Sequence, residues 1–253
     1  MMTSRIEITA VSGLPEVAEG DDLAALIHAA AEAQETPIAG DDVVVVAQKI
    51  VSKAEGAVVD LGGVIPSERA RELGELVGKD PRLVEVILGQ TRRIVRAVPG
   101  VLIVETIHGL VCANAGVDQS NVPGNGGALT LPRDPDASAR RLRAGLEARA
   151  GGRVAVIVSD SFNRPWRTGS VNVAIGTAGF QPLRDSRSRT DDHGRPLRAT
   201  VVSLADELAS AAQLVMGEFG GTPAAIVRGA GVEPADGVDS VVLRRDPARD
   251  LFR

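Results

Sequence analysis

Two lysines stand close together directly after an apolar run, in the segment QKIVSK at residues 48–53. Lys49 and Lys53 are two of the three lysines in a chain that otherwise uses arginine for its positive charge. An ammonium group is a compact charge that suits a phosphate oxygen where a planar guanidinium fits poorly. The spacing therefore indicates a local phosphate-binding element. A pair of solvated charges at the end of a strand is the competing interpretation.

Oxygen-bearing side chains follow a second apolar run in VAVIVSDSFNRPWR, residues 154–167. A buried strand leading into Ser159, Asp160 and Ser161 would place a carboxylate and two hydroxyls at its end, with two arginines a few residues further on. Hard divalent cations prefer such oxygen ligands, and arginine binds phosphate or carboxylate through its two-pronged guanidinium. A turn capped by Asp160 explains the same residues without a metal, and this segment alone does not decide between them.

A second candidate carboxylate, Asp118, lies in the loop NAGVDQSN at 114–121. Asp118 is placed to share a metal with Asp160, and the amide of Asn121 is suited to reading a base or a sugar. Asp and Asn also form Asx-turns readily, so a local turn is favoured when this loop is taken by itself.

The segment MGEFGGTP, residues 216–223, combines Glu218 with three glycines. Glycine permits positive φ and lets the backbone approach a ligand closely. The plainer interpretation is a glycine stop between a helix and the next strand.

The composition excludes several classes of protein. A net charge of −5 argues against a general binder of nucleic acid or acidic membranes, and an aromatic content of 2% leaves few platforms for stacking bases. The single cysteine, Cys112, rules out an intrachain disulfide and is expected in the core. No apolar stretch reaches the roughly 20 residues that span a bilayer, and the first residues lack a signal-peptide core, so a cytoplasmic protein is expected.

The pattern of apolar residues predicts a mixture of strands and helices. Strands are expected at 5–11, 42–48, 92–98, 101–106, 153–160 and 222–229, and helices at 21–34, 67–78, 80–89, 134–150 and 201–217. Ser67 and the pair Asp134–Pro135 are start signals for two of these helices. Residues 116–132 and 184–198 are expected as polar loops. We predict an α+β or mixed α/β fold over residues 1–253, with two intimate subdomains left open.

The standard nucleotide-binding motifs are missing: the chain has neither GxxxxGK[ST] nor GxGxxG before a helix, so a P-loop enzyme and a Rossmann dehydrogenase lose their main support.

Eight segments, taken in order, resemble the coenzyme F-420 γ-glutamyl ligase family. They are VVVVAQKIVSKAEGAVVDL, PSERARELGELVGKDPRLVEVIL, GLVCANAGVDQSNV, DPDASARRLR, VAVIVSDSFNRPWR, VAIGTAGFQPL, ADELASAAQLVMG and AAIVRG. The resemblance implies joining of L-glutamate to the lactyl carboxylate of the deazaflavin precursor coenzyme F-420-0, then addition of γ-linked glutamates. It further implies GTP as co-substrate, a divalent metal (Mg or Mn) with a monovalent cation as a further candidate, an acyl-phosphate intermediate, and an intertwined homodimer. The ending DPARDLFR resembles that of stand-alone members, so a complete ligase unit is expected.

The resemblance also assigns site residues, although it identifies no catalytic one. Metal ligands are expected at Asp118, Asp160, Ser161 and Glu218. Nucleotide contacts are expected at Gly13, Leu14, Pro15, Glu16, Gln48, Lys49, Lys53, Asn121, Met216, Gly217, Glu218, Phe219, Gly220, Gly221, Thr222 and Pro223.

Three positions depart from the family pattern: Ser161 replaces Thr, Asn163 replaces Gly, and Asn172 stands where an acid is expected. Ser161 preserves a hydroxyl, but the other two leave the substrate open. A ligase of the same fold acting on another carboxylate is therefore the first alternative. A non-catalytic nucleotide- or cofactor-binding module is the second, and the retained Asp118 and Asp160 count against it.

Overall fold

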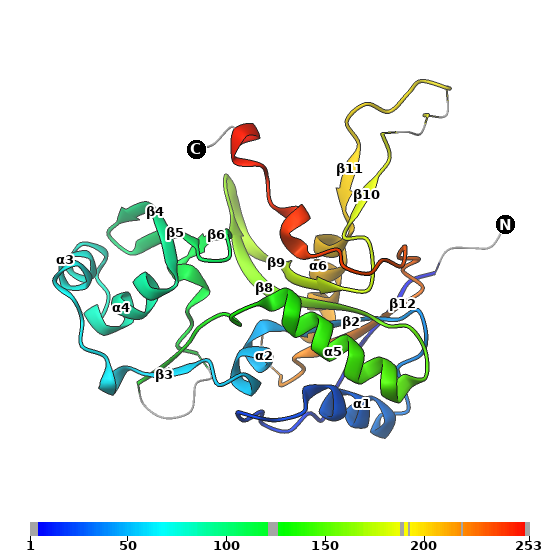
Figure 1. Ribbon diagram of the computed structural model, residues 1–253, viewed down its shortest axis with the longest axis horizontal. Helices are drawn as coiled ribbons and strands as arrows, with labels where there is room; N and C mark the ends of the chain where they lie inside the picture. The colour runs from blue at the N-terminus through cyan, green and yellow to red at the C-terminus, as the bar shows by residue number, and fades with distance from the viewer. Residues whose placement is uncertain (1–4, 121–125, 188–189, 192, 219, 251–253) are drawn as a thin grey trace.

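A five-stranded mixed sheet forms the centre of the protein (Figure 1). The computed structural model describes residues 5–120, 126–187, 190–191, 193–218 and 220–250. The sheet has the order β1 (Glu7–Ala10), β12 (Ala224–Arg228), β2 (Val43–Ala47), β8 (Ala155–Arg164) and β9 (Arg167–Ala178). Within it β2 and β8 run parallel, and the other neighbours are antiparallel. The predicted mixed α/β fold is confirmed.

Both faces of this sheet are apolar because helices cover both. Val44 and Val46 face the layer of α1 (Leu23–Ala33) and α5 (Pro135–Ala150), whereas Val43 and Val45 face α6 (Leu204–Met216). Successive side chains of a strand point to opposite faces, so an uninterrupted run of valines supplies both layers at once. All four of these valines are fully buried.

A second, smaller unit packs beside the main sheet and has its own core (Figure 1). It contains α3 (Glu68–Val77), α4 (Pro81–Gly89) and the sheet of β4 (Thr91–Val98), β5 (Val101–Thr106) and β6 (Val111–Ala113). Two further two-stranded ladders join β3 (Val58–Asp60) to β7 (Gly127–Leu129) and β10 (Leu183–Asp185) to β11 (Val201–Ser203). The last ladder projects as an arm in Figure 1. Short 3-10 turns lie at Leu61–Gly63, Asn114–Gly116, Ser240–Leu243 and Pro247–Arg249.

The two predicted helix starts are confirmed by their capping bonds. The Ser67 hydroxyl accepts the backbone N–H of Ala70, and Asp134 accepts that of Ala137 with Pro135 in the first turn. Each cap satisfies a backbone donor that the helix itself leaves unpaired.

Several predicted elements need correction. QKIVSK is part of a helix, α2 (Gln48–Ala54), which follows β2 without a loop. The strand predicted at 153–160 continues to Arg164, because the unpredicted strand β9 pairs with it over its whole outer half. Asp160 therefore lies inside a strand and not at its end.

Two further boundaries differ. Residues 201–203 form β11, and the helix predicted from 201 begins only at Leu204. β7 lies within the predicted loop 116–132, and β10 overlaps the start of the loop predicted at 184–198. In both places the partner strand lies far away in the sequence or is only three residues long, so local composition gives little signal.

Among the helices that the structure describes, none is long and apolar enough to cross a membrane.

Candidate functional site

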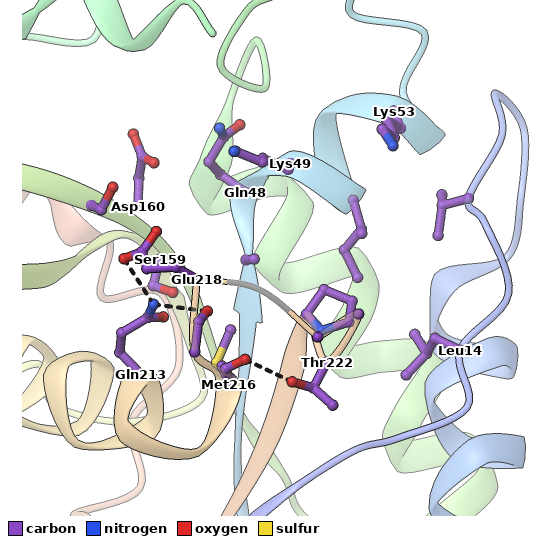
Figure 2. A pocket seen from close by; sticks show the side chains of 18 of the residues that line it. Leu14, Gln48, Lys49, Lys53, Ser159, Asp160, Gln213, Met216, Glu218 and Thr222 are labelled. Atoms are coloured by element: carbon purple, nitrogen blue, oxygen red, sulfur yellow. Dashed lines mark hydrogen bonds between the residues drawn. The ribbon is translucent and has the colours of Figure 1, made fainter. Parts of the chain in front are cut away.

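A pocket of about 720 Å³ opens where β2 ends and where β8 leaves the buried part of the sheet. Ala47 and Ser159, paired neighbours on these parallel strands, lie at its floor. Side chains from the N-terminal loop, α2, β8 and the end of α6 face this common space (Figure 2). The carboxyl ends of parallel strands are a common place for ligands in α/β sheets.

Most of the predicted site residues meet in this pocket, although they come from four separate parts of the chain. Those that line it are Leu14, Pro15, Glu16, Gln48, Lys49, Lys53, Asp160, Ser161, Met216, Gly217, Glu218, Gly220, Gly221, Thr222 and Pro223.

Lys53 is a buried cation. Its side chain is 8% exposed and forms an ion pair with Glu16, whose side chain is 76% exposed. The interpretation of Lys53 as a solvated surface charge is therefore wrong. An ammonium group at this depth needs an anion, because burying an unpaired charge costs several kcal/mol. Glu16 supplies that anion from the N-terminal loop.

Lys49 binds the second candidate carboxylate. Its Nζ lies 2.6 Å from Asp118 Oδ2 and donates to Ser120 Oγ at 2.8 Å. The backbone N–H of Ser120 also donates to Asp118 Oδ1 at 2.8 Å, which forms the Asx-turn considered from the sequence. The predicted Asx-turn is confirmed, and Asp118 is also the partner of a cation that lines the pocket, whereas a metal shared with Asp160 stays a prediction.

The two aspartates differ in their acidity. Burial alone would raise the pKa of Asp118, but hydrogen bonds from Lys49 and Ser120 outweigh it and hold that pKa below its usual value. Burial raises the pKa of Asp160 to about 7; a backbone hydrogen bond from Ser161 and the charge of Lys49 oppose the shift, and the charge of Asp118 adds to it. Asp160 is thus the carboxylate that most needs a positive partner.

Cys112 lies near this aspartate in the core. Its side chain is buried, and burial, with the nearby charge of Asp160, raises the pKa of the thiol to about 12. A thiol that stays protonated is a poor nucleophile. The predicted core role of Cys112 is confirmed.

A row of amide side chains closes the wall beside Asp160. Asn172 Nδ2 on β9 donates to Gln213 Oε1 on α6 at 2.9 Å, and it lies 3.4 Å from Ser159 Oγ. Gln213 Nε2 donates in turn to the carbonyl of Gly217 at 3.0 Å and to Glu218 Oε1 at 3.3 Å (Figure 2). Hydrogen bonds therefore join the sheet to the loop that carries Glu218.

The loop after α6 depends on glycine, as predicted. Gly217, Gly220 and Gly221 all have positive φ, and Gly217 has φ 67° with ψ 177°, a region that is essentially restricted to glycine. Thr222 Oγ1 donates to the carbonyl of Met216 at 2.6 Å and closes the loop on itself. Backbone atoms of this loop consequently line the pocket without side chains in front of them.

Comparison with known proteins assigns the family. The model of the F420-0:Gamma-glutamyl ligase family matches residues 13–229. The chain belongs to this family. A coenzyme F420:L-glutamate ligase of Methanopyrus kandleri is 48% identical over 242 residues, which cover 94% of each chain. Another, of Methanothermobacter thermautotrophicus, is 47% identical over 225 residues, covering 88% of this chain and 89% of the relative. A third, of Methanococcus maripaludis, is 39% identical over the full length of both.

In this family member, a few predicted residues stand outside the pocket. Gly13 precedes Leu14 without lining it, and Asp118 reaches the pocket only through Lys49. Asn121 and Phe219 lie outside the described residues.

Sequence reasoning missed Gln213, together with the apolar lining residues Val17, Ala47 and Ile50. Gln213 lies four residues after Ala209 and one after Ala212, both buried on the apolar stripe of α6. A polar residue bordering such a stripe was the available signal.

The residues at this site fit a divalent cation that takes some of its ligands from the protein and the rest from phosphate. Among the residues that the structure describes, no three His, Cys, Asp or Glu side chains form a metal cluster. Mg²⁺ is commonly held by one or two carboxylates, with waters and substrate phosphates completing its shell. Asp160 and the hydroxyl of Ser161, which both line the pocket, are donors of that kind. Asp118 would have to leave Lys49 to join them.

Proposed function

We propose that this family member is a ligase that joins L-glutamate to the carboxylate of coenzyme F-420-0 and then adds further glutamates through γ-linkages, at the expense of GTP. The curated relatives carry the name coenzyme F420:L-glutamate ligase over nearly the whole chain, which supports the glutamate-adding chemistry. The observation that carries the proposal is one pocket lined by two lysines of α2, the half-buried Asp160 and the glycine loop. A pocket with cations opposite a carboxylate suits a triphosphate held with a metal.

The proposed reaction has two steps. An oxygen of the acceptor carboxylate attacks the γ-phosphorus of GTP, the bond to the bridging oxygen breaks, and GDP leaves with an acyl phosphate formed. The glutamate amine then attacks the acyl carbon, phosphate leaves, and the nitrogen gives up a proton as the amide forms. Both steps move negative charge onto phosphate oxygens, so fixed positive groups lower their barriers.

Within this proposal, α2 supplies the positive groups. Lys53 and Lys49 bind phosphate oxygens, and the N-terminal loop 14–17 and the loop 216–223 contact the rest of the nucleotide. Each lysine now neutralises a carboxylate, Glu16 or Asp118. Releasing a lysine to a phosphate therefore requires that the carboxylate left behind turn to solvent or to another cation.

Asp160, Asp118, Ser161 and Glu218 are the proposed ligands of Mg or Mn. A divalent cation bound there would neutralise charge on the phosphates. Asp160 holds its ligand oxygens rigidly, because it lies within the paired strands β8 and β9 and not in a loop. An intertwined homodimer, with the second copy as partner, is part of the same proposal, and sedimentation of the purified protein tests it.

The first test is a mass-spectrometric assay with coenzyme F-420-0, L-glutamate, GTP and either Mg²⁺ or Mn²⁺, with GDP release followed in parallel. We expect product masses to rise in glutamate steps with one GDP for each step. ATP in place of GTP tests the choice of nucleotide. GTP binding without glutamate addition would refute coenzyme F-420-0 as the acceptor substrate. A panel of other carboxylates would then test the alternative, a ligase of the same fold with another substrate.

A further inference from the structure

Gln213 connects two parts of the pocket wall that have no covalent link near the site. It lies in the last turn of α6, and its side-chain amide contacts Asn172 on one side and the loop 217–218 on the other. We propose that Gln213 is a positioning residue. The hydrogen bond that it accepts from Asn172 turns its Nε2 group toward Glu218, and Nε2 in turn directs the Glu218 carboxylate into the pocket. This inference rests on the proposed function, in which Glu218 contacts the metal or the nucleotide.

The buried side chain of Asn172 is held on both hydrogens of its amide group. Asn172 is 5% exposed, and its Nδ2 group has two hydrogens. One hydrogen faces Gln213 Oε1 at 2.9 Å and the other faces Ser159 Oγ at 3.4 Å. Ser210, one turn before Gln213, donates to the backbone carbonyl of Asn172 at 2.7 Å. Neighbouring positions of α6 thus hold both the backbone and the side chain of Asn172.

The neighbours of Gln213 fix the direction of its side-chain amide. Its Oε1 accepts from Asn172, so its Nε2 must point the opposite way, toward the Gly217 carbonyl and Glu218 Oε1. Reversing the amide would place Oε1 against two acceptors and Nε2 against a donor. One orientation therefore satisfies every group, and the Asn172 donor selects it.

This orientation of the Gln213 amide fixes the backbone of Gly217. The backbone N–H of Gly217 donates to the Gln213 carbonyl at 2.9 Å, while the Gly217 carbonyl accepts from the Gln213 side chain at 3.0 Å. Both polar backbone groups of this glycine, with its unusual φ and ψ, are fixed by one residue. Glu218 follows directly and is exposed, so the bond from Nε2 is what restrains its carboxylate.

The arrangement also accounts for the neutral residue at position 172. An aspartate there would offer acceptors only and would draw Nε2 of Gln213 toward itself. Oε1 would then face the Glu218 carboxylate and push it away. Asn172 and Gln213 are therefore matched, and an acid at 172 requires a different contact to Glu218.

The test measures binding of Mn²⁺ in the presence of GTP by electron paramagnetic resonance, with unfolding temperature as a separate readout. Gln213→Met keeps the length of the side chain and removes its hydrogen bonds. We expect Mn²⁺ affinity to fall about 10-fold or more, as for other residues that orient a metal ligand, with little change in unfolding temperature without ligands. In Gln213→Glu the introduced carboxylate repels Glu218, so we expect a larger loss of Mn²⁺ affinity. Gln90→Met, at the C-cap of α4 outside the pocket, is the matched control and should bind as wild type.

A double-mutant cycle decides whether Gln213 acts through Glu218. In a Glu218→Gln background, Gln213→Met should cost almost nothing further, because its target has gone. Two results would overturn the inference: an equal loss of Mn²⁺ affinity in both backgrounds, or an unchanged Mn²⁺ affinity in Gln213→Met. In either case, the proposed function still stands if the wild-type protein binds Mn²⁺ and GTP. If the wild-type protein binds neither Mn²⁺ nor GTP, the proposed function fails and the inference falls with it.

Discussion

The two walls of the pocket balance their charges in different ways. On the α2 wall, Lys49 and Lys53 each bind a carboxylate from a distant loop, Asp118 or Glu16. On the facing wall, Asp160 forms no ion pair within the part of the chain that the structure describes, and burial raises its pKa to about 7. Ion pairs neutralise the lysines of the α2 wall, whereas the raised pKa of Asp160 reflects a carboxyl group without an ion-pair partner among the described residues.

This difference indicates what each wall is built to accept. An ion pair exchanges one partner for another at small net cost, so the α2 wall suits an anion that competes for its lysines. A buried carboxylate with a raised pKa gains most from a cation that replaces its proton. The pocket thus has an anion-exchanging side and a cation-accepting side before any ligand arrives.

The largest expected effect breaks the cation-accepting wall. Asp160→Asn removes one negative charge without opening a cavity, so we expect turnover to fall more than about 100-fold, beyond the loss usual for residues that merely orient a ligand. The unfolding temperature at neutral pH should not fall. Steady-state GDP release across a range of Mn²⁺ concentrations measures the effect. Asp236→Asn, in an exposed ion pair away from the pocket, is the control. Unimpaired metal-dependent turnover in Asp160→Asn would remove this residue from the site.

A smaller effect is expected on the anion-exchanging wall. Lys53→Met removes a charge-assisted contact worth ~1.5 to 3 kcal/mol, so the GTP concentration needed for half-maximal rate should rise on the order of 10- to 100-fold. Stability should hold or improve, because an apolar side chain of similar length suits a site that is 8% exposed. Lys79→Met, on the third lysine and outside the pocket, is the matched control. An unchanged requirement for GTP would show that Lys53 serves only to bind Glu16.

The smallest effect concerns stability and pH. The pKa of Asp160 rises from 3.8 to about 7 on folding, so between about pH 4 and 7 the folded state keeps a proton that the unfolded state releases. Stability contributed by this residue therefore falls as pH rises through that window. Part of its surface still meets solvent in the pocket, so we expect a loss of roughly 1–2 kcal/mol, less than full burial would give.

Urea unfolding at pH 5 and pH 8, without metal or nucleotide, measures this loss. The free energy of unfolding of Asp160→Asn should lack this pH-dependent component. Its stability relative to the wild type should therefore increase as pH rises. Parallel behaviour of the two proteins would mean that Asp160 is already charged in the folded state.

The sequence predicted the site better than the elements that build it. The family resemblance gave Asp160 as a metal ligand and Lys53 and the segment 216–223 as nucleotide contacts. Asp160, Lys53 and the described residues of that segment line one pocket, while their roles stay predictions. The helix that carries the lysines was missed because Ala47, its N-cap, gives no side-chain capping bond and β2 runs into it without a break. The sequence around residue 47 therefore contains no signal from which the start of α2 could be predicted.

The amide network could not be predicted, for a different reason. Asn172 and Gln213 stand 41 residues apart, and their contact depends on β9 pairing with β8 and on α6 crossing the sheet. Position 172 was noticed only as a departure from the family pattern. The role of Asn172 depends on the direction of its hydrogen bond to Gln213, and residue types alone do not give that direction.

The parallel pairing of β2 with β8 also has a consequence for how the protein comes into being. Val43 pairs with Ala155, and the pocket is completed only by residues up to Pro223. Contacts so distant in sequence form late and slowly in folding. A chain emerging from the ribosome therefore has no partial pocket through most of its synthesis. Under the proposed function, GTP would stabilise only molecules whose main sheet is already complete.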